Sequence, residues 1–89
     1  MSHMTRKIVK AAIQPHRAFG QVVKVLREKL GLTQEELGER CDLDRTYISG
    51  IERGVRNPTI QTIWIIAGGL EISPQRLIEL TDSYIRDAG

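Results

Sequence analysis

The sequence predicts an all-α domain of five helices, on three observations. Apolar residues recur three and four positions apart, the spacing of one helix face, and no segment alternates apolar and polar residues over a strand length. Thr, Asp or Ser, which favour helix starts, precede four of the apolar stretches. The 89 residues suffice for one domain with a single modest core.

The first expected helix spans residues 16–30. Its apolar side chains recur at i, i+3, i+4, i+7 and i+11, which places them on one face. Gly31 follows at a position where helix ends favour a left-handed backbone. The stripe expected to face the core consists of Phe19, Val22, Val23, Leu26 and Leu30.

The segment before this helix is basic and weakly amphipathic. Residues 6–14 read RKIVKAAIQ, and Pro15 separates them from the helix that follows. They could form an extra helix or a loose arm. The opening Met-Ser-His-Met resembles a remnant of recombinant expression. The expected division is an arm or extra helix in residues 1–15 and one domain in residues 16–89.

Two short helices are expected next, and capping residues set their boundaries. Thr33 stands before the first, and Glu36 three residues later completes a capping box, so this helix spans residues 34–41. Asp44 precedes the second helix, which Gly54 ends. The residues expected to face inward from the pair are Leu37, Cys41, Ile48 and Ile51.

The last two helices also begin at capping residues. Thr59 precedes one of them, and Gly68 and Gly69 weaken its end. Ser73 precedes the other, with Pro74 at the first helical position, where a missing N–H leaves no bond unmade. Residues Ile60, Ile63, Ile66 and Ala67 are expected to face inward, and the final helix carries Leu77, Ile78, Leu80, Tyr84 and Ile85.

Composition and motifs exclude several classes of function. No run approaches the roughly 18 apolar residues of a membrane span, and the start lacks the apolar stretch of a signal peptide. The single cysteine, Cys41, allows no internal disulfide and fits a reducing, cytoplasmic setting. His16 has no partner at metal-ligand spacing, and no glycine-rich phosphate loop occurs. We expect no enzyme activity, no metal, no cofactor, no membrane contact and no small-molecule ligand.

Charge is unevenly distributed along the chain. The net charge of +2 divides into +6 for residues 1–31, −2 for residues 32–58 and −2 for residues 59–89. A basic N-terminal segment followed by two mildly acidic segments suits a polyanionic partner that binds one face of the protein. The alternative is that the basic segment is merely solvated.

The two short helices and the tight turn between them form a helix-turn-helix, whose second helix is free to enter a major groove. Around them, LREKLGLTQEELGERCDLDRTYISGIERGVRNPTI resembles the lambda-repressor-like (Cro/CI-type, XRE family) DNA-binding domain, over about Phe19 to Leu80. Within that family, LDRTYISGIERGVRNPT together with GLEIS is most similar to the controller proteins of restriction–modification systems. The resemblance implies a sequence-specific regulator that binds double-stranded operator DNA and controls its own promoter and a neighbouring endonuclease gene.

Residues at the starts of the two short helices are the first candidates for DNA contacts. Gln34 occupies the first helical position, where peptide N–H groups and the helix dipole favour phosphate. The resemblance makes both Gln34 and Thr33 anchoring positions. The guanidinium of Arg45 can donate two hydrogen bonds, to O6 and N7 of one guanine, and Thr46 can contact thymine or another base edge. In the family, the positions that match Arg45 and Thr46 read bases.

Further contacts are expected along and after the same helix. Ser49 lies one turn into the helix and could meet a phosphate or a base. Tyr47 could either pack under the helix start or give its hydroxyl to a phosphate. The resemblance places Arg53, Arg56 and Asn57 beside the sugar–phosphate backbone, where contacts set register. Surface solubility is the alternative explanation for these last three residues.

Other residues are expected to shape the fold. By resemblance, Arg27 pairs with Glu52 across two helices and orients the DNA-reading helix. Gly38 and Asp42 stand where the family usually has alanine and glycine; the glycine preserves close approach, and aspartate tolerates positive φ. Gly50 stands where larger polar residues are common, either to clear space for DNA or simply to remove a contact.

Surplus apolar residues predict a homodimer. Trp64 and Ile65 lie on a helix face that the family usually fills with charged residues, and the final helix carries more apolar bulk than one small core requires. A two-fold dimer through these helices would place two recognition helices about 34 Å apart, matching a pseudo-palindromic operator. Local core packing is the alternative. The expected interface consists of Trp64, Ile65, Leu77, Ile78, Leu80 and Ile85.

The competing hypothesis is a protein-interaction module of the same fold, such as an antitoxin. Arg45, Thr46 and the flanking arginines favour DNA, whereas the apolar surface at Trp64 and Ile65 suits a partner protein as well as a second copy. Binding through several phosphates weakens steeply with salt, so the salt dependence of binding separates the two hypotheses.

Overall fold

The computed structural model describes residues 14–88, which form five α-helices and no strand. The helices are α2 (Pro15–Lys29), α3 (Gln34–Cys41), α4 (Arg45–Glu52), α5 (Ile60–Gly69) and α6 (Pro74–Ala88). The predicted all-α class is therefore confirmed. The predicted arm or extra helix falls almost entirely on residues 1–13, outside the described residues, and Pro15 opens α2 instead of separating it from what precedes.

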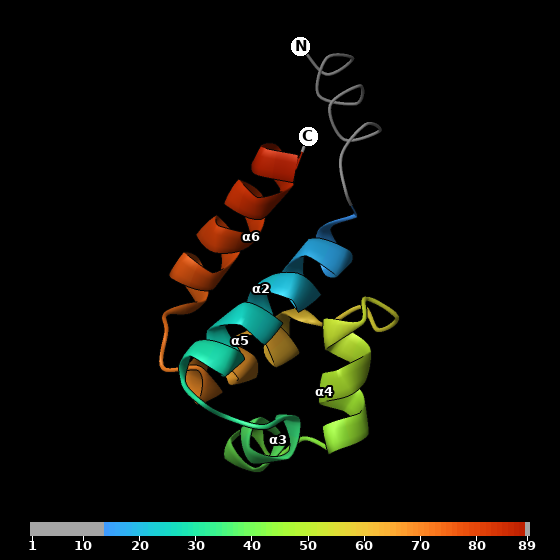
Figure 1. Cartoon of the computed structure of the whole chain (residues 1–89), viewed down its shortest axis with the longest axis vertical. Helices are drawn as coiled ribbons and strands as arrows, with labels where there is room; N and C mark the ends of the chain where they lie inside the picture. The colour runs from blue at the N-terminus through green and yellow to red at the C-terminus, as the bar shows by residue number, and fades with distance from the viewer. Residues whose placement is uncertain (1–13, 89) are drawn as a thin grey trace.

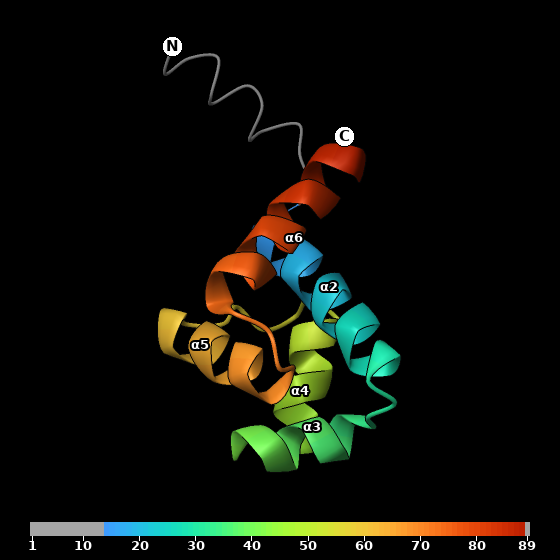
Figure 2. The same ribbon diagram turned by 90° about the vertical axis from the view of Figure 1, so that its left-hand side faces the viewer.

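The helices surround one core in two groups. Helix α2 contacts α4 and α6, and α3 contacts α4 and α5. The long helix α6 and the first turns of α2 lie at one end of the molecule, whereas α3 and α4 lie at the other (Figure 1). Figure 2 shows the same division after a quarter turn, with α5 beside the α3–α4 pair. Within residues 14–88, no helix combines the length and the apolarity that crossing a membrane requires.

The predicted helix starts are confirmed by their hydrogen bonds. The hydroxyl oxygen of Thr33 accepts from the backbone N–H of Glu36 at 3.0 Å, and the Glu36 carboxylate accepts from the backbone N–H of Thr33 at 2.8 Å. This reciprocal pair is the expected capping box. The side chains of Asp44, Thr59 and Ser73 cap α4, α5 and α6 by accepting from backbone N–H groups within the first turn.

The turn between α3 and α4 depends on two residues. Asp42 adopts a left-handed backbone with φ 55°, as expected from its position after α3. The backbone N–H of Leu43 then donates to the carbonyl of Gly38 at 2.8 Å. A Cβ on Gly38 would lie 2.5 Å from the carbonyl oxygen of Leu43, so any larger residue here would require the backbone of the turn to shift.

The core follows the predicted stripes with two exceptions. Leu30 is 40% exposed because it is the C-cap residue that follows α2, beyond the last turn that packs inward. Ile60 is 70% exposed, although we expected it to face the core, because it is the first residue of α5 and points away from the bundle. The buried apolar cluster consists of Phe19, Val22, Val23, Leu37, Cys41, Ile48, Ile51, Ile66, Ala67, Leu70 and Leu77.

Candidate nucleic-acid interface

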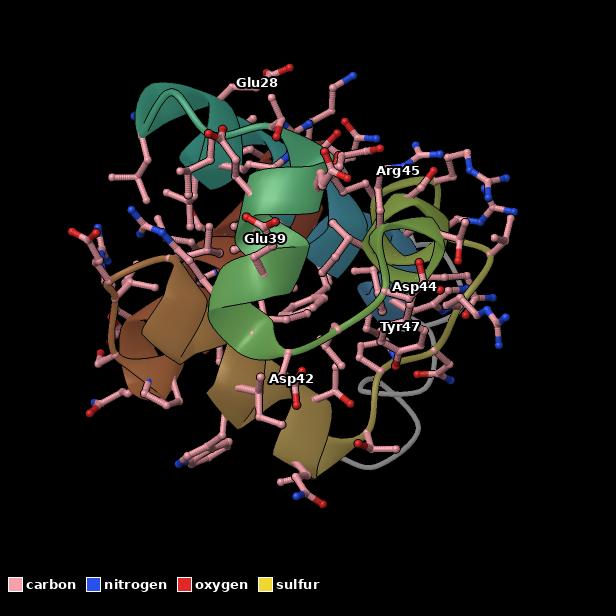
Figure 3. The ribbon with its side chains drawn as sticks, turned by 90° about the horizontal axis from the view of Figure 1, so that it is seen from below. Glu28, Glu39, Asp42, Asp44, Arg45 and Tyr47 are labelled. Atoms are coloured by element: carbon pink, nitrogen blue, oxygen red, sulfur yellow. The ribbon has the colours of Figure 1, made fainter. Side chains whose placement is uncertain are left out.

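The first turn of α4 is exposed. Asp44 caps the helix through its Oδ1, which accepts from the backbone N–H of Thr46 at 3.1 Å. This cap leaves the side chains of Arg45 and Thr46 in solvent. Figure 3 views the molecule from the α3–α4 end and shows Asp44, Arg45 and Tyr47 around the start of α4. Nothing within residues 14–88 covers this tip, so it is available to a partner.

A second polar pair lies one turn further along α4. The Nε of Arg53, the C-cap residue that follows α4, donates to the hydroxyl oxygen of Ser49 at 3.2 Å. Arg53 is exposed and Ser49 is half-buried. Ser49 therefore steadies the arginine, and its hydroxyl proton remains free for a further acceptor.

The loop after α4 folds back onto the helix. Gly54 turns the chain with φ 73°, and the backbone N–H groups of Val55 and Arg56 both donate to the carbonyl of Gly50, at 3.0 and 3.2 Å. The guanidinium carbon of Arg56 then lies 5.7 Å from the centre of the Tyr47 ring, within the range of a cation–π contact. Tyr47 also packs against the buried core cluster.

This arrangement changes the interpretation of Gly50. We expected Gly50 either to clear space for DNA or to remove a contact. In the structure Gly50 is buried beneath the side chain of Arg56, which occupies that space. Clearance for DNA at Gly50 stays a prediction. The contact with Arg56 had no local signal in the sequence, because Arg56 lies outside the helix.

Gln34 is held inside the protein more firmly than we expected for a phosphate anchor. Its side-chain amide is half-buried, and Nε2 donates to Oε1 of Glu52 at 3.0 Å. An amide nitrogen carries two hydrogens, so one N–H of Gln34 remains for another acceptor. The Thr33 hydroxyl likewise retains its proton after accepting from the backbone at the start of α3.

The predicted pair of Arg27 and Glu52 is confirmed. Nε and Nη2 of Arg27 donate to the two carboxylate oxygens of Glu52 at 2.6 and 2.9 Å, and Nη1 donates to the carbonyl of Leu32 at 2.7 Å. Both side chains are buried. The hydrogen bond to Glu52 raises the pKa of Arg27 further above its ordinary value. Arg27 therefore keeps its charge, and its hydrogen bonds join α2, the loop before α3 and the end of α4.

Negative charge gathers on one side of α4. The groove between α3 and α4 is lined by Glu35, Glu39, Asp42 and Asp44, together with the base-reading candidates Arg45 and Thr46. Figure 3 shows Glu39 on α3 and Asp42 at its end, in the face that contains the labelled start of α4. A phosphate backbone would be repelled from this groove.

An apolar surface lies on α5 and α6, but its members differ from the predicted ones. Trp64 and Ile78 are 57% and 44% exposed and line one groove. Leu77 is completely buried in the core, so its assignment to an interface is wrong. Ile65, Leu80 and Ile85 are half-buried, and the first two pack against the core cluster. Ile60, four residues before Trp64, is exposed on the same side of α5 and was missed.

A capped short helix, a tight left-handed turn and a second helix with an exposed start define a helix-turn-helix protein. The chain belongs to the helix-turn-helix family of Cro/CI-type transcriptional regulators, which matches residues 23–77. This result confirms the resemblance drawn from the sequence.

Known relatives and solved structures agree on the type of regulator. Control protein C.BamHI of Bacillus amyloliquefaciens is 45% identical over 64 residues, which cover 71% of this chain and 79% of the relative. The restriction–modification controller protein C.AhdI of Aeromonas hydrophila is 42% identical, with a TM-score of 0.68, over 70% of this chain and 94% of that one. The controller C.Esp1396I, solved as a tetramer on its natural 35 base-pair operator, is 40% identical with a TM-score of 0.77, over 83% and 97% of the two chains.

Proposed function

We propose that this protein is a restriction–modification controller that binds a pseudo-palindromic operator in double-stranded DNA as a homodimer. The proposal rests on the observation that α4 is hydrogen-bonded to the rest of the fold at its C-terminal end and exposed at its N-terminal end. Its last residue, Glu52, is fixed by Arg27 and Gln34, whereas its first turn presents Arg45 and Thr46 to solvent. A helix held firmly at one end and exposed at the other suits insertion into a major groove.

Direct base contacts would come from the first turn of α4. The guanidinium of Arg45 can donate two hydrogen bonds to O6 and N7 of one guanine, a pattern that only a G·C pair offers in the major groove. Thr46, beside it, can meet a thymine methyl or a base edge. Specificity would therefore rest on these two residues.

Phosphate contacts would fix the register of the protein on the duplex. The free N–H of Gln34 and the hydroxyl proton of Thr33 stand at the start of α3, where the helix dipole also favours an anion. Arg53, Arg56 and Asn57 are exposed on the loop side of α4. Contacts from both sides of the recognition helix would hold its axis in the groove.

The second copy of the chain would bind at the apolar surface of α5 and α6. Helix α5 contains no charged residue in its ten positions, and helices of that composition are normally covered on every side. Ile60, Trp64 and Ile78 supply the exposed apolar area. A two-fold dimer through this surface would set the two recognition helices about 34 Å apart, one turn of duplex.

In the cell, this activity would be regulatory and not enzymatic. A controller of this kind acts on its own promoter and on a neighbouring endonuclease gene, in the cytoplasm where that DNA is transcribed. It needs no cofactor or small-molecule effector, because occupancy of the operator depends on the concentration of the dimer itself.

Selection of bound sites from a random DNA pool tests the proposal. We expect two related half-sites whose centres are about 10 base pairs apart. The affinity for the selected site should fall steeply between 50 and 200 mM salt, roughly 100-fold or more if several phosphates are contacted. Binding that ignores both sequence and salt would reject DNA recognition.

The same exposed apolar surface favours one second candidate, an interaction module that uses α5 and α6 to bind a different protein. Sedimentation of the purified chain separates the candidates. A stable homodimer would bury the surface against itself, whereas a monomer at tens of micromolar would leave Trp64 free for another partner.

A further inference from the structure

Gly50 and Arg56 are in contact across the outer face of α4. A Cβ on Gly50 would lie 2.6 Å from Cγ of Arg56 and 3.6 Å from its Nε. The stem of the arginine therefore lies where any larger side chain at position 50 would stand. The same glycine also supplies the carbonyl that accepts from the backbone N–H groups of Val55 and Arg56.

Helical spacing places the contact between Gly50 and Arg56 next to the first turn of α4. Gly50 lies one turn after Thr46 and Tyr47, so all three are on neighbouring parts of one helix face. With its stem on Gly50, Arg56 extends toward the exposed start of α4, and its guanidinium stands over the ring of Tyr47. An arginine from the following loop is thereby placed beside residues of the first turn.

The glycine is unfavourable for the helix itself. Its backbone is α-helical and needs no positive φ, and glycine in a helix interior is less stable than alanine there. Because Gly50 has no side chain, the stem of Arg56 can lie against the backbone of α4 at this position.

We propose that Gly50 is a positioning residue for DNA recognition, which seats Arg56 on α4 so that Arg56 contacts the phosphate backbone beside the bases read by Arg45 and Thr46. The inference rests on the proposed function, because it concerns how the same interface meets DNA. The ring of Tyr47 supports this position through its cation–π contact with the Arg56 guanidinium.

A double-mutant cycle on the selected operator tests the role of Gly50. Arg56→Ala should weaken binding roughly tenfold and reduce the slope of log affinity against log salt by about one. Gly50→Ala should weaken binding to a similar degree, and the double variant should be no weaker than Arg56→Ala alone. Unchanged binding by Gly50→Ala, or losses that multiply in the double variant, would overturn the proposal.

A second measurement needs no DNA and so separates this inference from the proposed function. In the free protein, NMR resonances of the Arg56 side chain should be shifted by the Tyr47 ring and should return toward free-arginine values in Gly50→Ala. Gly68→Ala is the matched control for this measurement and for the melting temperature, because a Cβ on Gly68 meets no atom within 4 Å. Arg56 resonances that stay in place in Gly50→Ala would reject the seat even if the wild-type protein binds its operator.

Folding of the variants gives a further check. If Gly50→Ala unfolds the protein because Arg56 cannot move, removal of Arg56 in the double variant should restore the fold. Restored folding would support the contact, and a double variant that remains unfolded would show that Gly50 serves the helix packing and not the arginine.

Discussion

The guanidinium of Arg27 and the carboxylate of Glu52 form a two-bond ion pair, with N···O distances of 2.6 and 2.9 Å. Their side chains are only 10% and 3% exposed. Arg27 belongs to α2 and Glu52 is the last residue of α4, so the pair fixes the direction of the recognition helix relative to the helix that crosses it. Gln34 joins α3 to the same carboxylate.

Replacement of Arg27 by methionine should lower the free energy of unfolding by about 3–5 kcal/mol, because the buried charge of Glu52 would keep only a neutral amide as its partner. Urea unfolding followed by circular dichroism measures this loss. Arg86→Met is the matched control, since its pair with Asp82 is exposed and should be worth less than about 1 kcal/mol. Equal losses in the two variants would contradict the importance of burial.

Replacement of Arg45 by alanine should weaken binding to the selected operator by about 1–3 kcal/mol and relax the preference at one base pair. The reason is that a bidentate contact to guanine is lost while the phosphate contacts remain. Competition binding against all four bases at each position measures the preference. Equal weakening on every sequence would mean that Arg45 contacts only phosphate.

Replacement of Trp64 by glutamate should raise the dissociation constant of the dimer by roughly 30-fold or more, because large central aromatic residues of interfaces are commonly worth about 2 kcal/mol or more. Analytical ultracentrifugation over a concentration series measures the change. Val55→Glu is a useful control, since Val55 is 63% exposed but lies in the loop after α4. Dimers that are insensitive to Trp64→Glu would place the interface elsewhere.

Replacement of Asp42 by glycine should stabilise the fold by about 0.5–1 kcal/mol, because the residue has φ 55°, a conformation that glycine adopts without the steric cost of a Cβ. Thermal unfolding measures the gain. Gly31→Ala is the reverse experiment: Gly31 has φ 73° and open space around it, so alanine should destabilise the fold through backbone strain alone. A neutral or negative result for Asp42→Gly would mean that the aspartate side chain stabilises the turn.

The thiol of Cys41 should react slowly in the folded protein. Burial raises its pKa, and Sγ lies 3.6 Å from the carbonyl oxygen of Ile65. Both the scarcity of thiolate and the lack of access oppose alkylation, so at pH 8 the folded protein should react at least about tenfold more slowly than the same chain in urea.

The raised pKa of Cys41 also makes the free energy of unfolding depend on pH. Since this pKa is higher in the folded than in the unfolded state, the free energy of unfolding should decline as the pH rises above the ordinary pKa of a free thiol, about 8.5. Comparison with Cys41→Ser isolates this decline.

The helix starts could be predicted from the sequence because capping is a local property. Thr33 and Glu36 satisfy one another within a single turn, so their pairing depends little on the rest of the chain. Asp44, Thr59 and Ser73 are confirmed for the same reason. The pair of Arg27 and Glu52 could be expected only through resemblance, since its members are 25 positions apart in the chain.

The orientation of α5 could not be predicted, because five of its first seven residues are large and apolar and several choices of inward face fit the spacing. The packing of α3 and α6 against α5 decides which residues are covered, so Ile60 is exposed and Ile65 is half-buried. Leu77 was assigned to an interface on apolar bulk alone, but it fills the core between the helices.

At the candidate interface, spacing predicted the exposed start of α4 but not the loop that packs on it. The contact between Gly50 and Arg56 depends on the left-handed turn at Gly54 and on two backbone hydrogen bonds to the Gly50 carbonyl. These are features of the folded chain and have no periodicity. The engagement of Gln34 with Glu52 was missed for the same reason.

The separation of the last turns of α6 from the α3–α4 end makes the molecule convenient for fluorescence work (Figures 1 and 2). Cys41 is the chain's single cysteine and is enclosed by the fold. A cysteine introduced at the exposed position Asp87 would therefore take up a maleimide dye selectively, on the side remote from the recognition helix. Arrival and departure of single molecules on a tethered duplex could then be timed without the dye touching the DNA.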